Sequence, residues 1–462
     1  MKETTLNPIG FGMLVILSVA MFLVPRRQVS IPFLIMACFI PQGQNIVILG
    51  MSFYLLRTLT IIGMIRCLVR REYTNLKWNG MDTAVMAWSI VGTIVFAIQA
   101  GPAGLVTKFG WFCDGALGYY VFRCVIRDIS DIRVVGWALS VIAVPLVVAF
   151  LIEHATAHNM FAVFGGVPAI TEMREGRLRC QGAFAHSILA GCFWAAVLPM
   201  LVAEWWQPAA KRALTIVGVV CGMSLIILSA SSTPIAGVGA AILGAGMFKI
   251  RNRMSLVRWL TLGLLVGLHL IMKAPVWSLV QRIDLAGGST GSFRYRLIDA
   301  AIHRFGEWWL LGTTDTAHWG WGLQDVCIQY VLEGVRGGAA SLFLFVLIFI
   351  LAFRNVGRLC RGAKSASELA LYWAIGVTLF VHCVNFIGVA YFGQITLLLF
   401  LHLAMAASLM SREPRRMPRS LSRRTISATR ATSQSMVISA QSRRLQIYGP
   451  ASKRLSKPSD TE

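Results

Sequence analysis

A polar stretch at 179–186 places an arginine and a histidine directly before an apolar segment. The guanidinium of Arg179 is a planar fork of donors that suits phosphate oxygens. Gly182 permits a tight backbone between the two residues. A second interpretation stays open, in which Arg179 or His186 only reaches toward the membrane–water interface. The stretch predicts an anion-binding group at the outer mouth of a membrane span.

A second stretch, 293–311, combines two helical periodicities. Apolar residues recur on one face, and a polar face carries Arg296, Asp299, His303 and Glu307 at intervals of three, four and four. The pattern predicts an amphipathic helix at the membrane surface, with Trp308 and its neighbour Trp309 as the interfacial anchor. Its polar face either closes over a site or is simply solvated.

A third stretch, 312–338, is rich in glycine and small residues, which permit irregular backbone near the membrane. Ionisable groups at that depth are costly and usually functional. His318 and Asp325 are the candidate proton acceptors. Glu333 and Arg336 follow as the next apolar segment begins. A fourth stretch, Ser229 to Pro234, predicts a tight turn between two spans.

The segments that position these stretches are apolar. The chain has 462 residues, of which 56% are hydrophobic and only 14% charged, with a mean hydropathy of +0.67. No soluble core absorbs so many apolar side chains, whereas lipid-facing helices do. We expect an all-α, polytopic transmembrane bundle of twelve or thirteen spans, since a span needs about 20 apolar residues. The candidates are 9–24, 29–45, 46–65, 82–99, 106–125, 134–152, 186–204, 212–229, 232–249, 256–273, 338–354, 368–388 and 390–411.

Clusters of Lys and Arg orient these spans. With thirteen spans, all seven basic clusters fall on one side, which the positive-inside rule makes cytoplasmic. Two long loops, at about 153–185 and 274–337, then face the opposite side. Both contain several arginines. Long loops are partly exempt from the positive-inside rule. These arginines therefore either have no functional role or bind an anionic ligand at the outer face.

Residues 412–462 contain 12 Lys/Arg against 3 Asp/Glu and are rich in Pro and Ser. Such a composition predicts a disordered cytoplasmic tail, more suited to anionic lipid headgroups than to nucleic acid. The membrane domain is then 1–411. The ten cysteines show no metal-ligand spacing, and we predict no metal site. The absence of a GxxxxGK[ST] motif argues against transport driven by ATP.

The order of these stretches resembles the O-antigen ligase and polymerase superfamily of membrane proteins. The family's Arg-x-x-Gly-x-Phe element is matched by Arg179, Gly182 and Phe184, and Pro199 lies at the far end of the span that follows. Arg294 or Arg296 then precedes Leu311-Gly312 at a fitting distance. Glu333-Gly334 matches the last motif, but Gln324-Asp325 stands where the family has His-Asn, so the family histidine is replaced by glutamine.

The resemblance implies a glycosyltransferase of the bacterial inner membrane, acting at the periplasmic face in cell-surface or exopolysaccharide synthesis. Its donor would be a glycan linked to undecaprenyl pyrophosphate, and its acceptor a sugar or a lipid. We expect no cofactor. Arg179 with Arg294 or Arg296 would bind the pyrophosphate, His318 or Asp325 would be the base, and Gly182, His186, His303, Glu333 and Arg336 would support them. The alternative is a non-catalytic or transport component of a polysaccharide export system.

Overall fold

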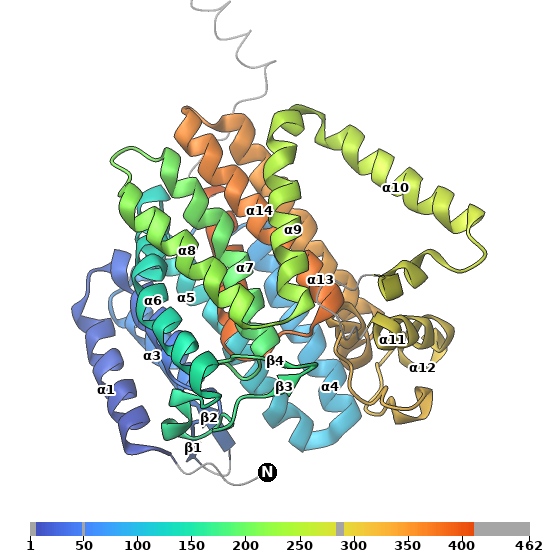
Figure 1. The fold of residues 1–462 in the computed structure, drawn as a ribbon, viewed down its shortest axis with the longest axis horizontal. Helices are drawn as coiled ribbons and strands as arrows, with labels where there is room; N and C mark the ends of the chain where they lie inside the picture. Colours follow the sequence, from blue (N-terminus) through green and yellow to red (C-terminus); the bar gives the residue numbers. More distant parts are fainter. Residues whose placement is uncertain (1–5, 49–50, 283–290, 411–462) are drawn as a thin grey trace, which may run out of the picture. The chain divides into compact units, whose positions relative to one another are not determined.

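The computed structural model describes residues 6–48, 51–282 and 291–410. Helix accounts for 77% of the structure, which confirms the all-α expectation. The α-helices (Figure 1) are α1 (Pro8–Leu23), α2 (Ser30–Phe39), α3 (Leu55–Val69), α4 (Gly80–Phe112), α5 (Gly118–Val125), α6 (Ile129–Thr156), α7 (Ser187–Ala203), α8 (Arg212–Leu228), α9 (Ser232–Gly246), α10 (Met254–Ile271), α11 (Gly291–His303), α12 (Phe305–Trp308), α13 (Gln329–Gly362), α14 (Ala366–Gly388) and α15 (Gln394–Met410).

Two short antiparallel hairpins make up the sheet structure of the described residues. β1 (Asn45–Ile48) pairs with β2 (Met51–Tyr54), and β3 (Met173–Arg174) pairs with β4 (Arg177–Leu178). Both hairpins lie at the same end of the helices, at the bottom of Figure 1. The second hairpin immediately precedes Arg179, so its register determines where that side chain points.

Six helical segments in the described part of the chain are long and apolar enough to cross a membrane. They are Gly80–Gly101, Ile129–Thr156, Ser187–Trp206, Ser232–Ile271, Gln329–Gly362 and Ala366–Gly388. Three shorter apolar helices accompany them: Pro8–Leu23, Arg212–Leu228 and Gln394–Met410. The expectation of a helical membrane bundle is therefore confirmed at this level, and the exact number of spans stays a prediction.

The expected spans at 29–45 and 46–65 differ from the structure. α2 has ten residues and is about 15 Å long, half of the ~30 Å hydrocarbon thickness. Pro41 and the polar residues after it end the helix, and the chain turns into β1 and β2 before α3 begins. The span expected at 106–125 is also interrupted. α4 kinks at Gly101, and a π-helical turn, Cys113–Leu117, separates it from α5.

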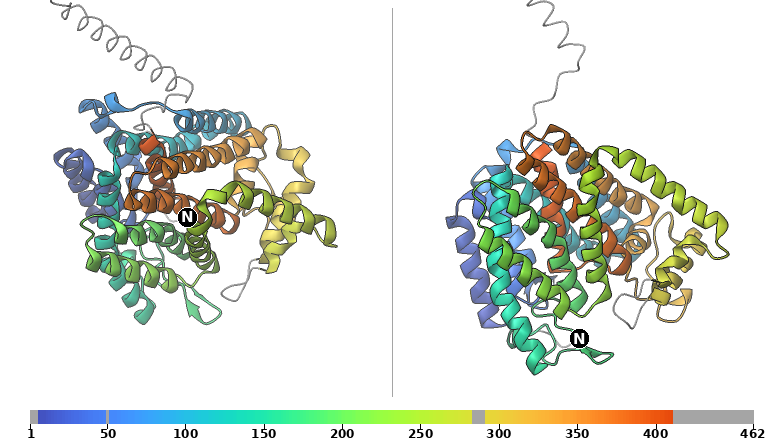
Figure 2. Two further views of the ribbon diagram at one scale, coloured as in Figure 1. Left: turned by 90° about the horizontal axis from the view of Figure 1, so that it is seen from above. Right: turned by 45° about the horizontal axis from the view of Figure 1, so that its top comes forward.

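The main core lies between α7, α14 and α15; most side chains of α7 and α15 are buried, as are ten of the 23 residues of α14. Around them pack α4, α6, α8, α9 and α13. α10 behaves differently, because none of its residues is buried. Figure 2 shows α10 extending away from the other helices in both views. An apolar helix that buries nothing within the protein suits contact with lipid.

The segment from α11 to the start of α13 has a small core of its own, formed by Leu297, Ala301, Trp308, Trp319, Leu323, Ile328 and Val335. The amphipathic pattern is confirmed, since Leu297 and Ala301 are buried whereas Arg296 and His303 are exposed. The helix is nevertheless broken at Arg304, between α11 and α12. Trp308 is buried in this core, so only its neighbour Trp309 is exposed as an interfacial anchor would be.

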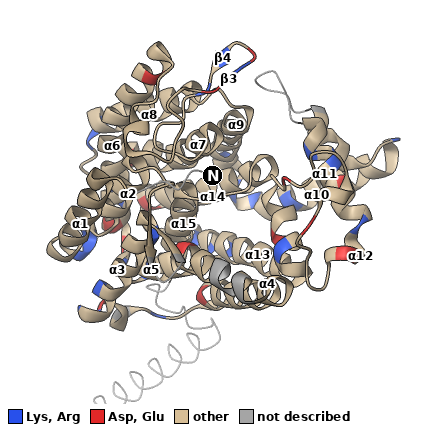
Figure 3. Ribbon diagram, turned by 90° about the horizontal axis from the view of Figure 1, so that it is seen from below, with Lys and Arg blue, Asp and Glu red and all other residues tan. Residues whose placement is uncertain are grey.

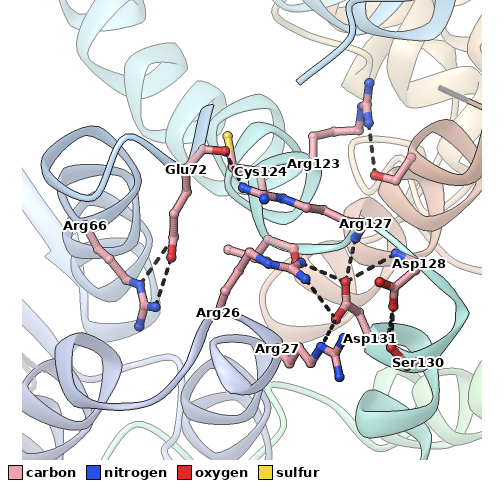
Figure 4. Close-up of polar contacts among 12 residues, drawn as sticks. Arg26, Arg27, Arg66, Glu72, Arg123, Cys124, Arg127, Asp128, Ser130 and Asp131 are labelled. Carbon is pink, nitrogen blue, oxygen red and sulfur yellow. Dashed lines mark hydrogen bonds and ion pairs between the residues drawn. The ribbon is translucent and has the colours of Figure 1, made fainter. Parts of the chain in front are cut away.

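Many of the basic residues near the other end of the bundle are paired with carboxylates. Arg26 donates to Asp131 at 2.7 Å, and Arg66 pairs with Glu72 at 3.0 Å (Figure 4). Arg123 forms a two-pronged ion pair with Asp82, at 2.7 and 2.9 Å, with both side chains buried. These arginines tie α1, α3, α4, α5 and α6 together, and their charges are balanced within the protein.

The tail prediction lies outside the described residues. The chain divides into two units, Met1–Arg412 and Glu413–Glu462, and the structure describes residues of the first only.

Candidate functional site

The turn between α8 and α9 brings two of the predicted arginines together. The guanidinium of Arg179 donates to the hydroxyl of Ser231 at 3.0 Å, and that of Arg294 donates to the hydroxyl of Thr233 at 3.2 Å. Both hydroxyls belong to the turn that the sequence predicted. Two arginines separated by more than a hundred residues therefore lie on one short segment, at the end of the bundle that Figure 3 shows from below.

The hairpin β3–β4 and the end of α8 hold Arg179 in place. The Arg179 backbone N–H donates to the Glu172 carbonyl at 2.9 Å, and the Cys180 N–H donates to the Leu228 carbonyl at 3.1 Å. The Arg179 guanidinium also pairs with both carboxylate oxygens of Glu172, at 3.0 and 3.1 Å. Arg179 is buried whereas the Glu172 side chain is half exposed, so the carboxylate covers the arginine from the solvent side.

Arg294 is buried without a compensating charge. It is only 8% exposed, and its partners are neutral: the Thr233 hydroxyl and, through Nε at 3.2 Å, the carbonyl of Gly388. No carboxylate among the described residues lies within ion-pair distance of it. Burial lowers the pKa of its guanidinium, and the positive charge of Arg174 on β3 acts in the same direction. A buried cation is expensive unless it is paired, so this arrangement favours an external anion.

A carboxylate that the sequence analysis missed shapes the backbone after Arg179. Glu153, near the end of α6, is buried and accepts from the backbone N–H groups of Gln181 at 3.1 Å and Gly182 at 2.9 Å. It also accepts from the Thr171 hydroxyl at 3.1 Å. The available signal was an acidic residue at the end of an apolar span, where charges are rare. Glu153 is a positioning residue for the Arg179 loop.

Gly182 cannot be replaced without strain, which gives a first prediction. Its φ is +56°, and a Cβ there would lie 2.4 Å from Cε2 of Phe150. We expect Gly182→Ala to lower the free energy of unfolding by about 2–4 kcal/mol, from the positive φ and the overlap together. Thermal unfolding of the purified protein in detergent measures this loss. Gly176→Ala is the control, since it also has a positive φ but an open environment. Equal losses in both variants would contradict the packing argument.

His186 lies beside Arg179 in its neutral form. Its Nδ1 accepts the N–H of Ile188 at 3.2 Å and so caps α7, which assigns the proton to Nε2. Burial and then the charge of Arg179 lower the pKa of the imidazole. The negative charge of Asp325 acts on the same ring. His186 is therefore a hydrogen-bond donor at this site, and Asp325 is an exposed carboxylate whose charge acts on it.

Three predicted residues are not brought to the two arginines. Arg296 is exposed, because two residues along a helix turn a side chain about 200° from Arg294. His303 is exposed and contacts Asp299. His318 pairs through Nε2 with Glu307 at 2.8 Å on the exposed face of α12. Hydrogen bonds from Trp319 and His318 lower the pKa of Glu307 to about 2.

The other two predicted residues, Glu333 and Arg336, lie in the first turns of α13. Glu333 is buried and accepts from Trp88 at 2.9 Å, from Gln329 at 2.8 Å and from Ser341 at 3.4 Å. The guanidinium of Arg336 stacks on Trp111, 4.2 Å from the ring centroid. Gln329 also accepts the backbone N–H of Tyr391 at 2.7 Å, which joins this cluster to the segment that follows Gly388.

Charge is the property that decides what this site can bind. The positive charge of Arg174 acts on both His186 and Arg294, and that of Arg179 acts on His186. The opposing negative charges are those of Glu172, which pairs with Arg179, and of Asp325. Among the described residues, no three His, Cys, Asp or Glu side chains gather as metal ligands would.

The sequence matches no protein-family model and no curated protein. The site itself, a buried cationic turn with an exposed carboxylate beside it, is therefore the basis for a functional proposal.

Proposed function

We propose that the protein is a glycosyltransferase of the bacterial inner membrane that transfers or polymerises a glycan from undecaprenyl pyrophosphate at the periplasmic face. The uncompensated, buried charge of Arg294 beside Arg179 is the observation that carries the proposal. A diphosphate supplies the missing negative charge, and guanidinium groups bind its oxygens in pairs. The order of motifs that resembles the O-antigen ligase and polymerase superfamily supports the same donor.

In this proposal β3–β4, the α8–α9 turn and α11 lie outside the cytoplasm. The positive-inside rule supports this orientation, because the short basic loops then lie on the opposite side. The lipid tail of the donor stays in the bilayer while its diphosphate reaches the arginines. An apolar helix such as α10, with no buried residue, is available to the lipid.

Besides the donor and the acceptor, the reaction needs only a general base. A hydroxyl oxygen of the acceptor attacks the anomeric carbon of the donor glycan, and a new C–O bond forms there. The bond from that carbon to the pyrophosphate oxygen breaks, and undecaprenyl pyrophosphate leaves with its electron pair. Arg179 and Arg294 stabilise the charge on the leaving group. Asp325 accepts the hydroxyl proton, because its charge acts on His186 beside Arg179, whereas His318 is hydrogen-bonded to Glu307.

The test is transfer by the purified protein in lipid nanodiscs. The donor is the radiolabelled lipid-linked oligosaccharide pool of the host, and the products are separated by length. We expect longer glycans, or glycan on a new acceptor, and we expect Arg179→Ala to abolish them without changing the amount of folded protein. Arg251→Ala, in the loop between α9 and α10, is the control and keeps its activity.

Transfer retained in Arg179→Ala would remove this residue from the site. Binding of the donor without transfer would instead favour a non-catalytic component of a polysaccharide export system. Failure of the wild-type protein to bind the donor would contradict the proposed function.

A further inference from the structure

The β3–β4 hairpin carries a carboxylate that occupies the exposed side of Arg179. Residues 172–177 are all exposed, and the hairpin projects past the neighbouring helices in Figure 3. Both side-chain oxygens of Glu172 accept from Nη1 of Arg179, at 3.0 and 3.1 Å. The Glu172 side chain is 49% exposed, whereas that of Arg179 is 6% exposed. One of the two guanidinium groups that we assign to the diphosphate is therefore already paired with an anion of the protein itself.

The backbone on either side of Glu172 is fixed, but its carboxylate is not. The preceding residue, Thr171, is buried, and its hydroxyl donates to Glu153 at 3.1 Å. The Glu172 carbonyl accepts the N–H of Arg179 at 2.9 Å. Because the side chain itself lies at the surface, a rotation about its own bonds is enough to take the carboxylate off Arg179. No movement of the hairpin backbone is needed.

This ion pair can be exchanged for another anion without loss of the arginine's position. Ion pairs with a partner at the surface contribute little to stability, because water competes for the exposed charge. The Nη2 of Arg179 donates to the hydroxyl of Ser231, a contact that does not involve Glu172. Arg294 has no carboxylate partner among the described residues. An incoming diphosphate thus meets one arginine without a counter-ion and one that must release its own.

The proposed reaction changes the charge that this site has to hold. In the donor, the diphosphate is esterified at both ends, to the lipid and to the glycan. When the glycan leaves, one phosphate gains an additional ionisable oxygen, so undecaprenyl pyrophosphate is the more strongly anionic of the two ligands. Two arginines alone would bind this product more tightly than the donor, and slow product release limits turnover in many enzymes. A carboxylate that competes for one of the arginines opposes this effect.

We propose that Glu172 exchanges with the diphosphate on Arg179: it leaves when the donor binds and returns after transfer, which displaces undecaprenyl pyrophosphate. This inference rests on the proposed function, because the ligands that compete with Glu172 are the donor and the product of that reaction. Glu172 acts through Arg179 and touches no reacting atom. It therefore sets the affinity for both pyrophosphate lipids and the rate of product release, but not the rate of the transfer step.

Glu172→Gln tests the exchange, with Glu175→Gln as its matched control. Glutamine keeps the size of the side chain and an oxygen that accepts from Arg179, but it removes the charge that competes with phosphate. Glu175 is exposed in the turn of the same hairpin, so its substitution changes the net charge equally. Undecaprenyl pyrophosphate is titrated by calorimetry into the full-length protein in nanodiscs. We expect Glu172→Gln to raise its affinity about three- to tenfold, and Glu175→Gln to change it less than about twofold.

Transfer assays add a readout that a merely structural role of Glu172 would not change. For Glu172→Gln we expect an unchanged single-turnover rate, a lower KM for the donor, a lower steady-state kcat and stronger inhibition by added undecaprenyl pyrophosphate. An affinity for this lipid that is the same in Glu172→Gln and Glu175→Gln, or that falls in Glu172→Gln, would overturn the exchange and leave the proposed function standing. Failure of the wild-type protein to bind the lipid would contradict the proposed function, and this inference with it.

Discussion

Replacement of Arg294 by methionine is expected to abolish glycan transfer without destabilising the ligand-free protein. The guanidinium is buried, its partners are a hydroxyl and a carbonyl, and no described carboxylate balances it. Removing one preorganised donor of a transition-state site lowers kcat by about 10²- to 10³-fold. Removing an uncompensated buried charge leaves the free energy of unfolding unchanged or raises it by about 1–2 kcal/mol.

Arg123→Met is the matched control for this prediction. Arg123 is as buried as Arg294, but its loss leaves the fully buried carboxylate of Asp82 without its cation. Breaking a buried ion pair in this way costs about 3–5 kcal/mol. Thermal unfolding in detergent, with the transfer assay in parallel, compares the two variants. A destabilisation of Arg294→Met as large as that of Arg123→Met would show that Arg294 is a structural arginine and would contradict the proposed site.

Substitution of Asp325 by asparagine is expected to lower kcat for transfer by about 10²- to 10⁴-fold, the range in which general bases contribute. Asparagine keeps the size of the side chain but cannot accept the proton. Binding of the donor should change little, because the arginines remain. His318→Gln should retain transfer close to the wild-type rate, since the Nε2 of His318 is hydrogen-bonded to Glu307 on the exposed face of α12.

Steady-state kinetics on both variants check this assignment, with the donor saturating and the acceptor varied. The opposite outcome, in which His318→Gln loses transfer and Asp325→Asn keeps it, would move the base to the histidine. That result would also require α12 to approach the arginine turn during the reaction.

Much of the site could be predicted from the sequence because its parts lie at the ends of apolar segments. Arg179 and the serine-rich turn stand out as polar groups between two spans, and the structure joins them through Ser231. The choice between Arg294 and Arg296 could not be made, because it depends on the rotation of α11 about its axis. Burial of Leu297 sets that rotation, and it places Arg294 inward and Arg296 outward.

Other features depend on contacts between distant segments, which a single sequence does not contain. Glu153 acts on the Arg179 loop only because α6 ends beside it, and Glu172 covers Arg179 only because of the β3–β4 register. The helical pattern also continued through Arg304, where the structure turns from α11 into α12.

The most direct test of a pyrophosphate site at Arg179 and Arg294 is a comparison of three lipids by titration into the protein in nanodiscs. The lipids are undecaprenyl pyrophosphate, undecaprenyl phosphate and undecaprenol. We predict that affinity falls in that order, and that Arg294→Met and Arg179→Ala remove the preference for the pyrophosphate. Equal affinity for all three lipids in the wild-type protein, or a preference that survives both substitutions, would contradict the site.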